Sequence, residues 1–164
     1  YGSQTSYYLQ FPNSEKQSNY RSGLKTYFLL LLGILIIEII LGTEIRGGLE
    51  MIRKENPIVD SQFLLHMLGP FKYAHTIFGI LIALISSYLW YNLTIQEKEP
   101  SSLIKVTSTL IVFLVYSQIF LGEILVFFDV IPLLQLFHLW FASLIVGLVM
   151  IQFLAWKQSQ ITNE

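Results

Sequence analysis

The stretch LLQLFHLWFASLIVGL, residues 133–148, decides the fold class of this 164-residue chain. It is apolar enough to form most of a membrane-spanning helix, which needs about 20 such residues. One residue in it, His138, does not suit lipid, because burying a polar group without a hydrogen-bond partner costs about 2–7 kcal/mol. His138 therefore needs a partner inside a bundle of helices.

The composition agrees with residence in a membrane. The chain is 54% hydrophobic and 13% charged, with a mean hydropathy of +0.59. A soluble domain of this size could not bury so much apolar surface. The formal net charge of −1 gives no basis for binding nucleic acid. The chain has no cysteine, so disulfides and thiolate metal sites are excluded.

Four segments are long and apolar enough to cross a bilayer, and none shows the alternation of a barrel strand. We predict an all-α membrane protein, a four-transmembrane-helix bundle built from two pseudo-symmetric helix hairpins. A polar tail or linker over 1–23 precedes the predicted bundle at 24–157, and a C-terminal tail follows at 158–164. The predicted spans are 24–44, 73–93, 103–128 and 132–156, with a short interfacial helix near 63–68.

The distribution of positive charge predicts the orientation. Four spans put both termini on the same side of the membrane, and lysine and arginine favour the cytoplasmic side. The side of the termini carries six of the ten such residues, so we expect cytoplasmic termini in a bacterial-type inner membrane. The six are Lys16, Arg21, Lys25, Lys98, Lys105 and Lys157; the other side has Arg46, Arg53, Lys54 and Lys72.

The sequence contains an internal repeat. IIEIILGTE (36–44) aligns with YSQIFLGEI (116–124), which matches Glu38 with Gln118 and Gly42 with Gly122. Each unit is followed by a predicted helix that opens with a histidine, in AHTIFGILIAL from 74 and in FHLWFASLIVGL from 137. The two hairpins therefore contribute one histidine each.

These two histidines, His75 and His138, are the centre of the functional hypothesis. Their helices run in the same direction, and each histidine lies within about two turns of its helix start, so both imidazoles should lie at similar depth. Two imidazoles presented across a bundle can hold a haem iron from both sides. We predict a bis-histidine haem b in the half of the bilayer opposite the termini. The alternative is that the rings bond to neighbouring helices or interfacial water. His66 has no such match and is expected in a loop or interface.

Short side chains near the two histidines are expected to line the porphyrin. A flat macrocycle needs small neighbours, although close helix packing favours the same residue types. Arg46 could anchor a haem propionate, because its fork suits a carboxylate, or it could be a boundary arginine that reaches the membrane surface. The candidate lining residues are Gly42, Gly79, Gly122 and Ala142.

Glu38 is an ionisable residue inside the first span, where such residues usually face the bundle interior. It shares a helix face with Gly42 and Arg46, at four-residue spacing. It could pair with Arg46 or position water or a proton near the haem. It could equally be a neutral acid that hydrogen-bonds to Gln118.

Three ordered stretches resemble the C-terminal four-helix half of the haem A synthase family. EIILGTEIRGGLE (38–50) is similar to the family's Q-x-x-L-G-T-x-V-R-E segment, and YAHTIFG (73–79) to its x-x-H-R-S-F helix start. LGEILVFFDVIPLLQLFHLWFASLIVGL (121–148) resembles its last turn and final helix, histidine included. The resemblance covers residues 27–156 in the right order and spacing.

The resemblance implies a function. Enzymes of this family oxidise a ring methyl of haem O to the formyl group of haem A, for use by cytochrome oxidase, and their C-terminal half looks like a haem b site. Carried over, His75 and His138 are axial ligands, and Arg46 is a conformational or propionate partner. Lys72 stands where the family's catalytic half has a glutamate, and Thr76 where an arginine is usual. Glu38 replaces a usual glutamine. The chain alone is therefore expected to lack the oxygenating site.

Four functions stay open on the sequence. The first is the haem-b-binding half of a haem A synthase-like oxidoreductase, its second four-helix half lying in the same polypeptide or another chain. The second is a non-catalytic b-type cytochrome subunit of a larger electron-transfer complex. The third is a half-size synthase acting as a homodimer, and the fourth is a structural subunit without a cofactor. Membrane lipid is a partner in all four.

Overall fold

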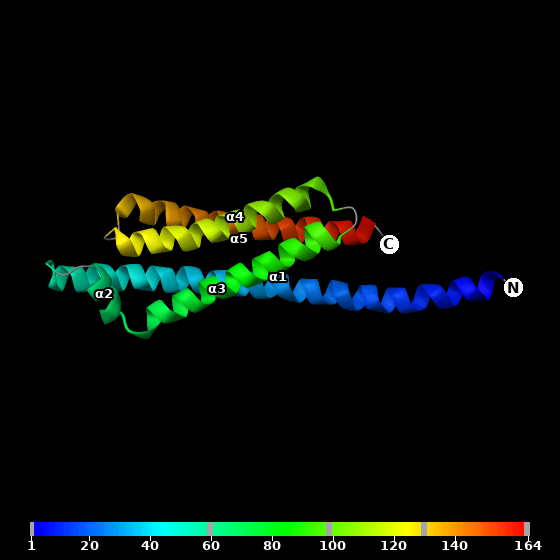
Figure 1. The fold of residues 1–164 in the computed structure, drawn as a ribbon, viewed down its shortest axis with the longest axis horizontal. Coiled ribbons are helices and arrows are strands. Elements are labelled where there is room, and N and C mark those ends of the chain that lie inside the picture. Colours follow the sequence, from blue (N-terminus) through cyan, green and yellow to red (C-terminus); the bar gives the residue numbers. More distant parts are fainter. Residues whose placement is uncertain (1, 59–60, 98–99, 129–130, 163–164) are drawn as a thin grey trace.

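The computed structural model describes the backbone of residues 2–58, 61–97, 100–128 and 131–162, and the side chains in these ranges except at 2–22, 61–62, 65 and 161–162. Every regular element in these ranges is a helix, which confirms the predicted all-α bundle (Figure 1). The elements are α1 (Gly2–Glu55), α2 (Ser61–Met67), α3 (Pro70–Tyr91), the π-helical turn η1 (Asn92–Gln96), α4 (Ser102–Phe127) and α5 (Pro132–Thr162).

Four of the helical stretches are long and apolar enough to cross a membrane, and they match the four predicted spans. α1 continues back to Gly2, through the stretch that the sequence predicts as a tail or linker. The short α2 stands where a short helix is expected. The candidate spans are Gly23–Glu55, Pro70–Gln96, Ser102–Phe127 and Pro132–Gln160.

The order of the helices around the bundle places α3 and α5 on a diagonal. α1 packs against α3 and α5, and α4 packs against the same two helices. α3 and α5 run in the same direction, and α1 begins at the end of the molecule where α5 ends (Figure 1). Residues on the inner faces of α3 and α5 therefore meet across the bundle interior.

Local sequence explains where three of these helices begin. Gly69 precedes α3 with a φ of 62°, a left-handed conformation that favours glycine, and Pro70 occupies the first turn. The Ser101 hydroxyl accepts a hydrogen bond from the Ile104 backbone N–H at 3.3 Å and so caps α4. Pro132 opens α5, as the sequence predicts.

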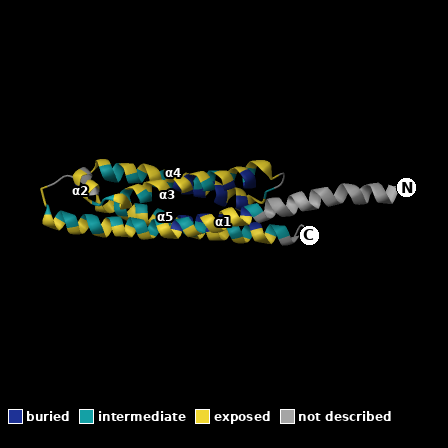
Figure 2. Cartoon of the chain, turned by 90° about the horizontal axis from the view of Figure 1, so that it is seen from below, coloured by how far each residue is buried: buried dark blue, intermediate teal, exposed yellow. Residues whose placement is uncertain are grey.

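The tightly packed core occupies only the half of the bundle nearer the termini (Figure 2). In the opposite half, Leu64 of α2 is the single fully buried apolar side chain among those described. That half therefore contributes little to the buried apolar core of the described residues. The buried core residues are Leu24, Phe28, Leu31 and Leu35 of α1, Ile82, Ala83 and Leu89 of α3, Leu93 of η1, Ile104, Ile111, Leu114 and Val115 of α4, and Ile145, Val149 and Trp156 of α5.

A buried polar pair joins α4 to α5 inside this core. Gln152 Nε2 donates a hydrogen bond to Ser108 Oγ at 2.5 Å, and both residues are almost completely buried. Because a buried polar group left without a partner is costly, this contact favours one register of α4 against α5.

We expect Ser108→Ala to lower the free energy of unfolding by about 1–3 kcal/mol, since the Gln152 amide would lose its buried acceptor. The double variant Ser108→Ala/Gln152→Leu should recover most of that loss, because both polar partners are then removed. Unfolding of the detergent-solubilised protein measures the effect. Ser143→Ala is the matched control, because that hydroxyl is exposed and bonds only its own helix, at Leu139 O. A single variant as stable as wild type would contradict the expectation.

Candidate functional site

His75 and His138 lie at equivalent places on the diagonal helices. His75 is five residues after Pro70, where α3 begins, and His138 is six residues after Pro132, where α5 begins. At 1.5 Å per residue they lie about 8 and 9 Å from their helix starts. Both are half-buried. The half of the bundle opposite the termini thus holds two imidazoles at similar depth.

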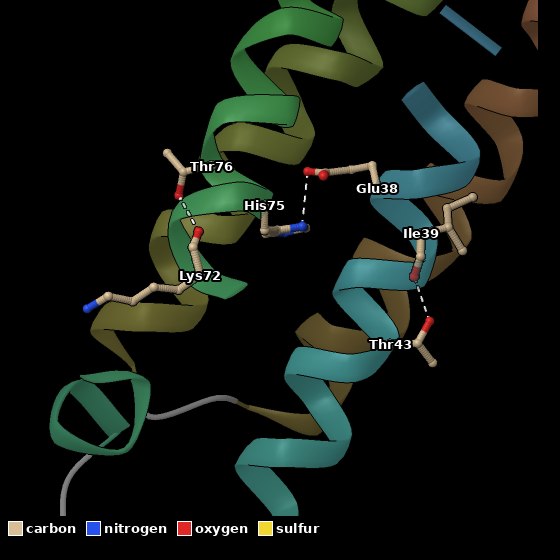
Figure 3. A network of polar contacts seen from close by, with 6 residues as sticks. All are labelled: Glu38, Ile39, Thr43, Lys72, His75 and Thr76. Carbon is tan, nitrogen blue, oxygen red and sulfur yellow. Dashed lines mark hydrogen bonds and ion pairs between the residues drawn. The ribbon is translucent and has the colours of Figure 1, made fainter. Parts of the chain in front are cut away.

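The first hairpin surrounds His75 with two residues of α1. Figure 3 shows Glu38 reaching from α1 toward His75 on α3, with Glu38 Oε1 at 3.0 Å from His75 Nδ1. One turn further along α1, a Cβ built on Gly42 would lie 3.5 Å from His75 Cε1. A Cβ there would be in ordinary van der Waals contact with the ring, so only a side chain larger than alanine would enter the space of the imidazole.

The second hairpin repeats this arrangement with one change. A Cβ built on Gly122 of α4 would lie 3.8 Å from His138 Cε1, so the second ring also lies against a glycine. Gln118, at the position of Glu38, donates from Nε2 to the backbone carbonyl of His138 at 2.5 Å. The sequence repeat is thus also a structural repeat, but its polar residue contacts a ring in one hairpin and the backbone in the other.

The small residues predicted to line a porphyrin have different neighbours in the structure. Gly42 and Gly122 face the imidazoles themselves, and a Cβ on Gly79 would lie 3.4 Å from Glu38 Oε1. Ala142, one turn after His138, is half-buried on α5. Three of the four therefore lie directly beside the histidines or the glutamate; that they also contact a porphyrin stays a prediction.

Several polar atoms at this site are buried without a hydrogen-bond partner among the described residues. They are His75 Nδ1, Glu38 Oε2, His138 Nδ1 and Gln118 Oε1. His75 Nδ1 is within hydrogen-bond distance of Glu38 Oε1, but its N–H is not aligned on that oxygen. Each such atom costs about 1–3 kcal/mol, and native proteins rarely keep them without a reason. Because atoms at equivalent positions are unpaired in both hairpins, we interpret them as parts of one functional site.

Within the described residues, no three histidine, cysteine, aspartate or glutamate side chains gather to hold a bare metal ion. A protein metal site usually supplies three or four ligands. Two histidines suffice when the remaining ligands come from a macrocycle, as in a haem with two axial imidazoles. The donor set therefore fits a metal porphyrin better than a free ion.

The remaining predicted residues lie toward the end of the bundle opposite the termini. Arg46 is exposed on α1, one turn beyond Gly42. Lys72 Nζ lies 3.2 Å from His66 Nδ1 and 4.8 Å from the centre of the Tyr73 ring. His66 is exposed in the short helix α2 rather than in a loop, and its expected position at the membrane interface stays a prediction.

The sequence did not lead us to predict the contact between Glu38 and His75. The two partners weighed for Glu38, Arg46 and Gln118, are not among its contacts in the described part of the chain; Gln118 bonds to His138 instead. The alignment of Glu38 with Gln118, each four residues before a glycine, was the available clue. These are equivalent positions, and the residue at each of them contacts the histidine of its own hairpin.

Comparison with known proteins gave one match. The sequence model of the COX15-CtaA family, described as cytochrome oxidase assembly protein, matches residues 3–150. Searches of curated proteins and of solved structures gave no match. The family match includes all four candidate spans up to position 150 and both histidines.

Proposed function

The chain belongs to the COX15-CtaA family of cytochrome oxidase assembly proteins, and from this premise we propose that it binds a b-type haem between His75 and His138. It is an integral membrane protein with a role in cytochrome oxidase assembly. The proposed role is that of the haem-b-binding half of a haem A synthase-like oxidoreductase. The termini are proposed to face the cytoplasm, on the positive-inside rule.

The observation that carries the proposal is the set of unpaired buried atoms around two equivalent histidines. Polar atoms of His75 and Glu38 in one hairpin, and of His138 and Gln118 in the other, lack partners among the residues described. The surrounding half of the bundle lacks the tight core of the other half. A flat, largely apolar ligand with a metal at its centre fits both features.

Each residue of the chain has a distinct task in this proposal. His75 and His138 would hold the haem iron through their ring nitrogens, with Gly42 and Gly122 beside the two rings. A haem bound there would supply one-electron transfer. Arg46 and the α3 lysine at position 72 would meet the propionates at the end of the bundle opposite the termini, because cations suit carboxylates.

The lysine at the start of α3 bears on whether this chain also oxidises haem O. General acid–base chemistry needs a group that exchanges protons near the operating pH, and Lys72 stands where the catalytic half of haem A synthases is expected to have a glutamate. We therefore propose that oxidation of haem O requires a second four-helix half. A b-type cytochrome subunit of a larger membrane complex is the second candidate, and the same lysine favours it.

Titration of the purified full chain with haem b tests the proposal. We expect saturation at one haem per chain and a six-coordinate, low-spin b-type spectrum in both oxidation states. Haem O added with a reductant and oxygen should be recovered unchanged. A spectrum of free or five-coordinate haem at saturation would reject the proposed site. Formation of haem A would instead reject the proposal that a second four-helix half is required, and would favour a half-size synthase.

A further inference from the structure

We infer that Glu38 is a positioning residue for His75: its carboxylate accepts the Nδ1–H of that ring and thereby turns Nε2 toward the ligand. Gln118 gives no equivalent support to the His138 ring. The two histidines are therefore held unequally, one through its side chain and one through its backbone. The inference deepens the proposed haem site, but its first test needs no haem.

The geometry around Glu38 carries the inference. Its Oε1 lies 3.0 Å from His75 Nδ1, and the carboxylate comes from α1 while the ring comes from α3 (Figure 3). Gly79, one turn after His75, has no side chain, and a Cβ there would come within 3.4 Å of the same oxygen. The carboxylate oxygen that faces the His75 ring thus also lies close to the α3 backbone at Gly79.

The contact between the His75 Nδ1–H and the Glu38 carboxylate has a suitable distance but is not aligned as a hydrogen bond. His75 Nδ1 and Glu38 Oε2 are buried and unpaired in the part of the chain that the structure describes. Alignment of the N–H on the carboxylate would satisfy this donor. Histidines that bind metals almost always donate their other ring N–H to a carboxylate, a carbonyl or water. Glu38 is the group in position to accept it.

The second hairpin lacks this arrangement for a chemical reason. A carbonyl oxygen can only accept, so the Gln118 group facing the His138 backbone must be the amide nitrogen. That contact fixes the α5 backbone at His138 rather than its ring. An amide oxygen is also a weaker acceptor than a carboxylate, because charge-assisted hydrogen bonds are about twice as strong as neutral ones.

The first test uses the full chain without haem, labelled with ¹⁵N-histidine in detergent at a pH where the rings are neutral. We expect the NMR signals of His75 to show the proton on Nδ1. Glu38→Leu should abolish that preference, and the matched variant Gln118→Leu should leave His75 unchanged. His75→Ala assigns the signals. An unprotonated Nδ1 in wild type, or a His75 tautomer unaffected by Glu38→Leu, would overturn the inference.

The second test uses the same variants with haem b. Loss of a partner of this kind typically weakens metal binding about 10–100-fold, so Glu38→Leu should raise the haem dissociation constant by that factor. Glu38→Gln should restore most of the affinity but raise the reduction potential, since a carboxylate acceptor makes the imidazole more basic and favours ferric iron. A purely structural role would not predict that split. An unchanged potential in Glu38→Gln would contradict the inference.

The two tests separate this inference from the proposed function. If wild type binds no haem but His75 carries its proton on Nδ1 in a Glu38-dependent way, the haem proposal fails and the positioning role stands. If haem binds through both histidines but the tautomer is independent of Glu38, the haem proposal stands and this inference fails.

Discussion

Replacing either His75 or His138 with alanine is expected to abolish the six-coordinate b-type spectrum of the haem-loaded protein. Each ring is proposed to supply one of only two protein ligands, and no third histidine lies on the inner faces of α3 and α5 in the described ranges. Absorption and electron paramagnetic resonance spectra of purified variants, loaded with haem b, measure the effect.

A surface histidine provides the control for this experiment. His66→Ala should keep the wild-type spectrum, because His66 is exposed on α2, its ring contacts Lys72, and it is not one of the proposed iron ligands. The fold should survive all three substitutions, since the tight core lies in the other half of the bundle. Six-coordinate spectra in both the His75 and His138 variants would show that the ligand assignment is wrong.

Enlarging the glycines that face the two imidazoles should have the next largest effect. A Cβ at Gly42 or Gly122 already reaches 3.5 or 3.8 Å from a histidine ring, so the further carbons of a leucine would occupy the place of that ring. Overpacking costs about 1–3 kcal/mol, and about 1.4 kcal/mol corresponds to tenfold in affinity. We expect Gly42→Leu and Gly122→Leu to weaken haem b binding about tenfold to a hundredfold.

Two other glycines in the spans give matched controls. A Cβ at Gly33 or Gly147 meets nothing within 4 Å, so Gly33→Leu and Gly147→Leu should bind haem as wild type does. Haem titration of all four variants, with helical content checked by circular dichroism, makes the comparison. Equal affinities across the four would mean that the rings do not need the space beside Gly42 and Gly122.

The fold class could be predicted from the sequence because its cause is local. Each span needs about 20 apolar residues in one run, and in lipid a helix satisfies its own backbone hydrogen bonds. Two helix starts could also be predicted from the sequence. Pro132 opens α5 as predicted, and Pro70 after Gly69 opens α3 close to the predicted start at 73. These features depend on residues that are neighbours in the chain.

The pairing within the site depended instead on which helices adjoin. The sequence repeat aligns Glu38 with Gln118, and a hydrogen bond between the two was one of the predictions for Glu38. The bundle separates them, because α1 packs on α3 and α5 while α4 packs on the same two helices. Each residue therefore faces the histidine helix of its own hairpin. No periodicity in the sequence states this order of helices.

By itself, the sequence determined four apolar spans, two hairpins related by a repeat, and one histidine near the start of a helix in each. Those follow from hydropathy and spacing along one chain. Only the tertiary structure decided that Glu38 meets the His75 ring while Gln118 meets the His138 backbone. It also decided that tight packing stops before the histidines are reached. Both depend on contacts between distant segments, which exist only once the helices have packed.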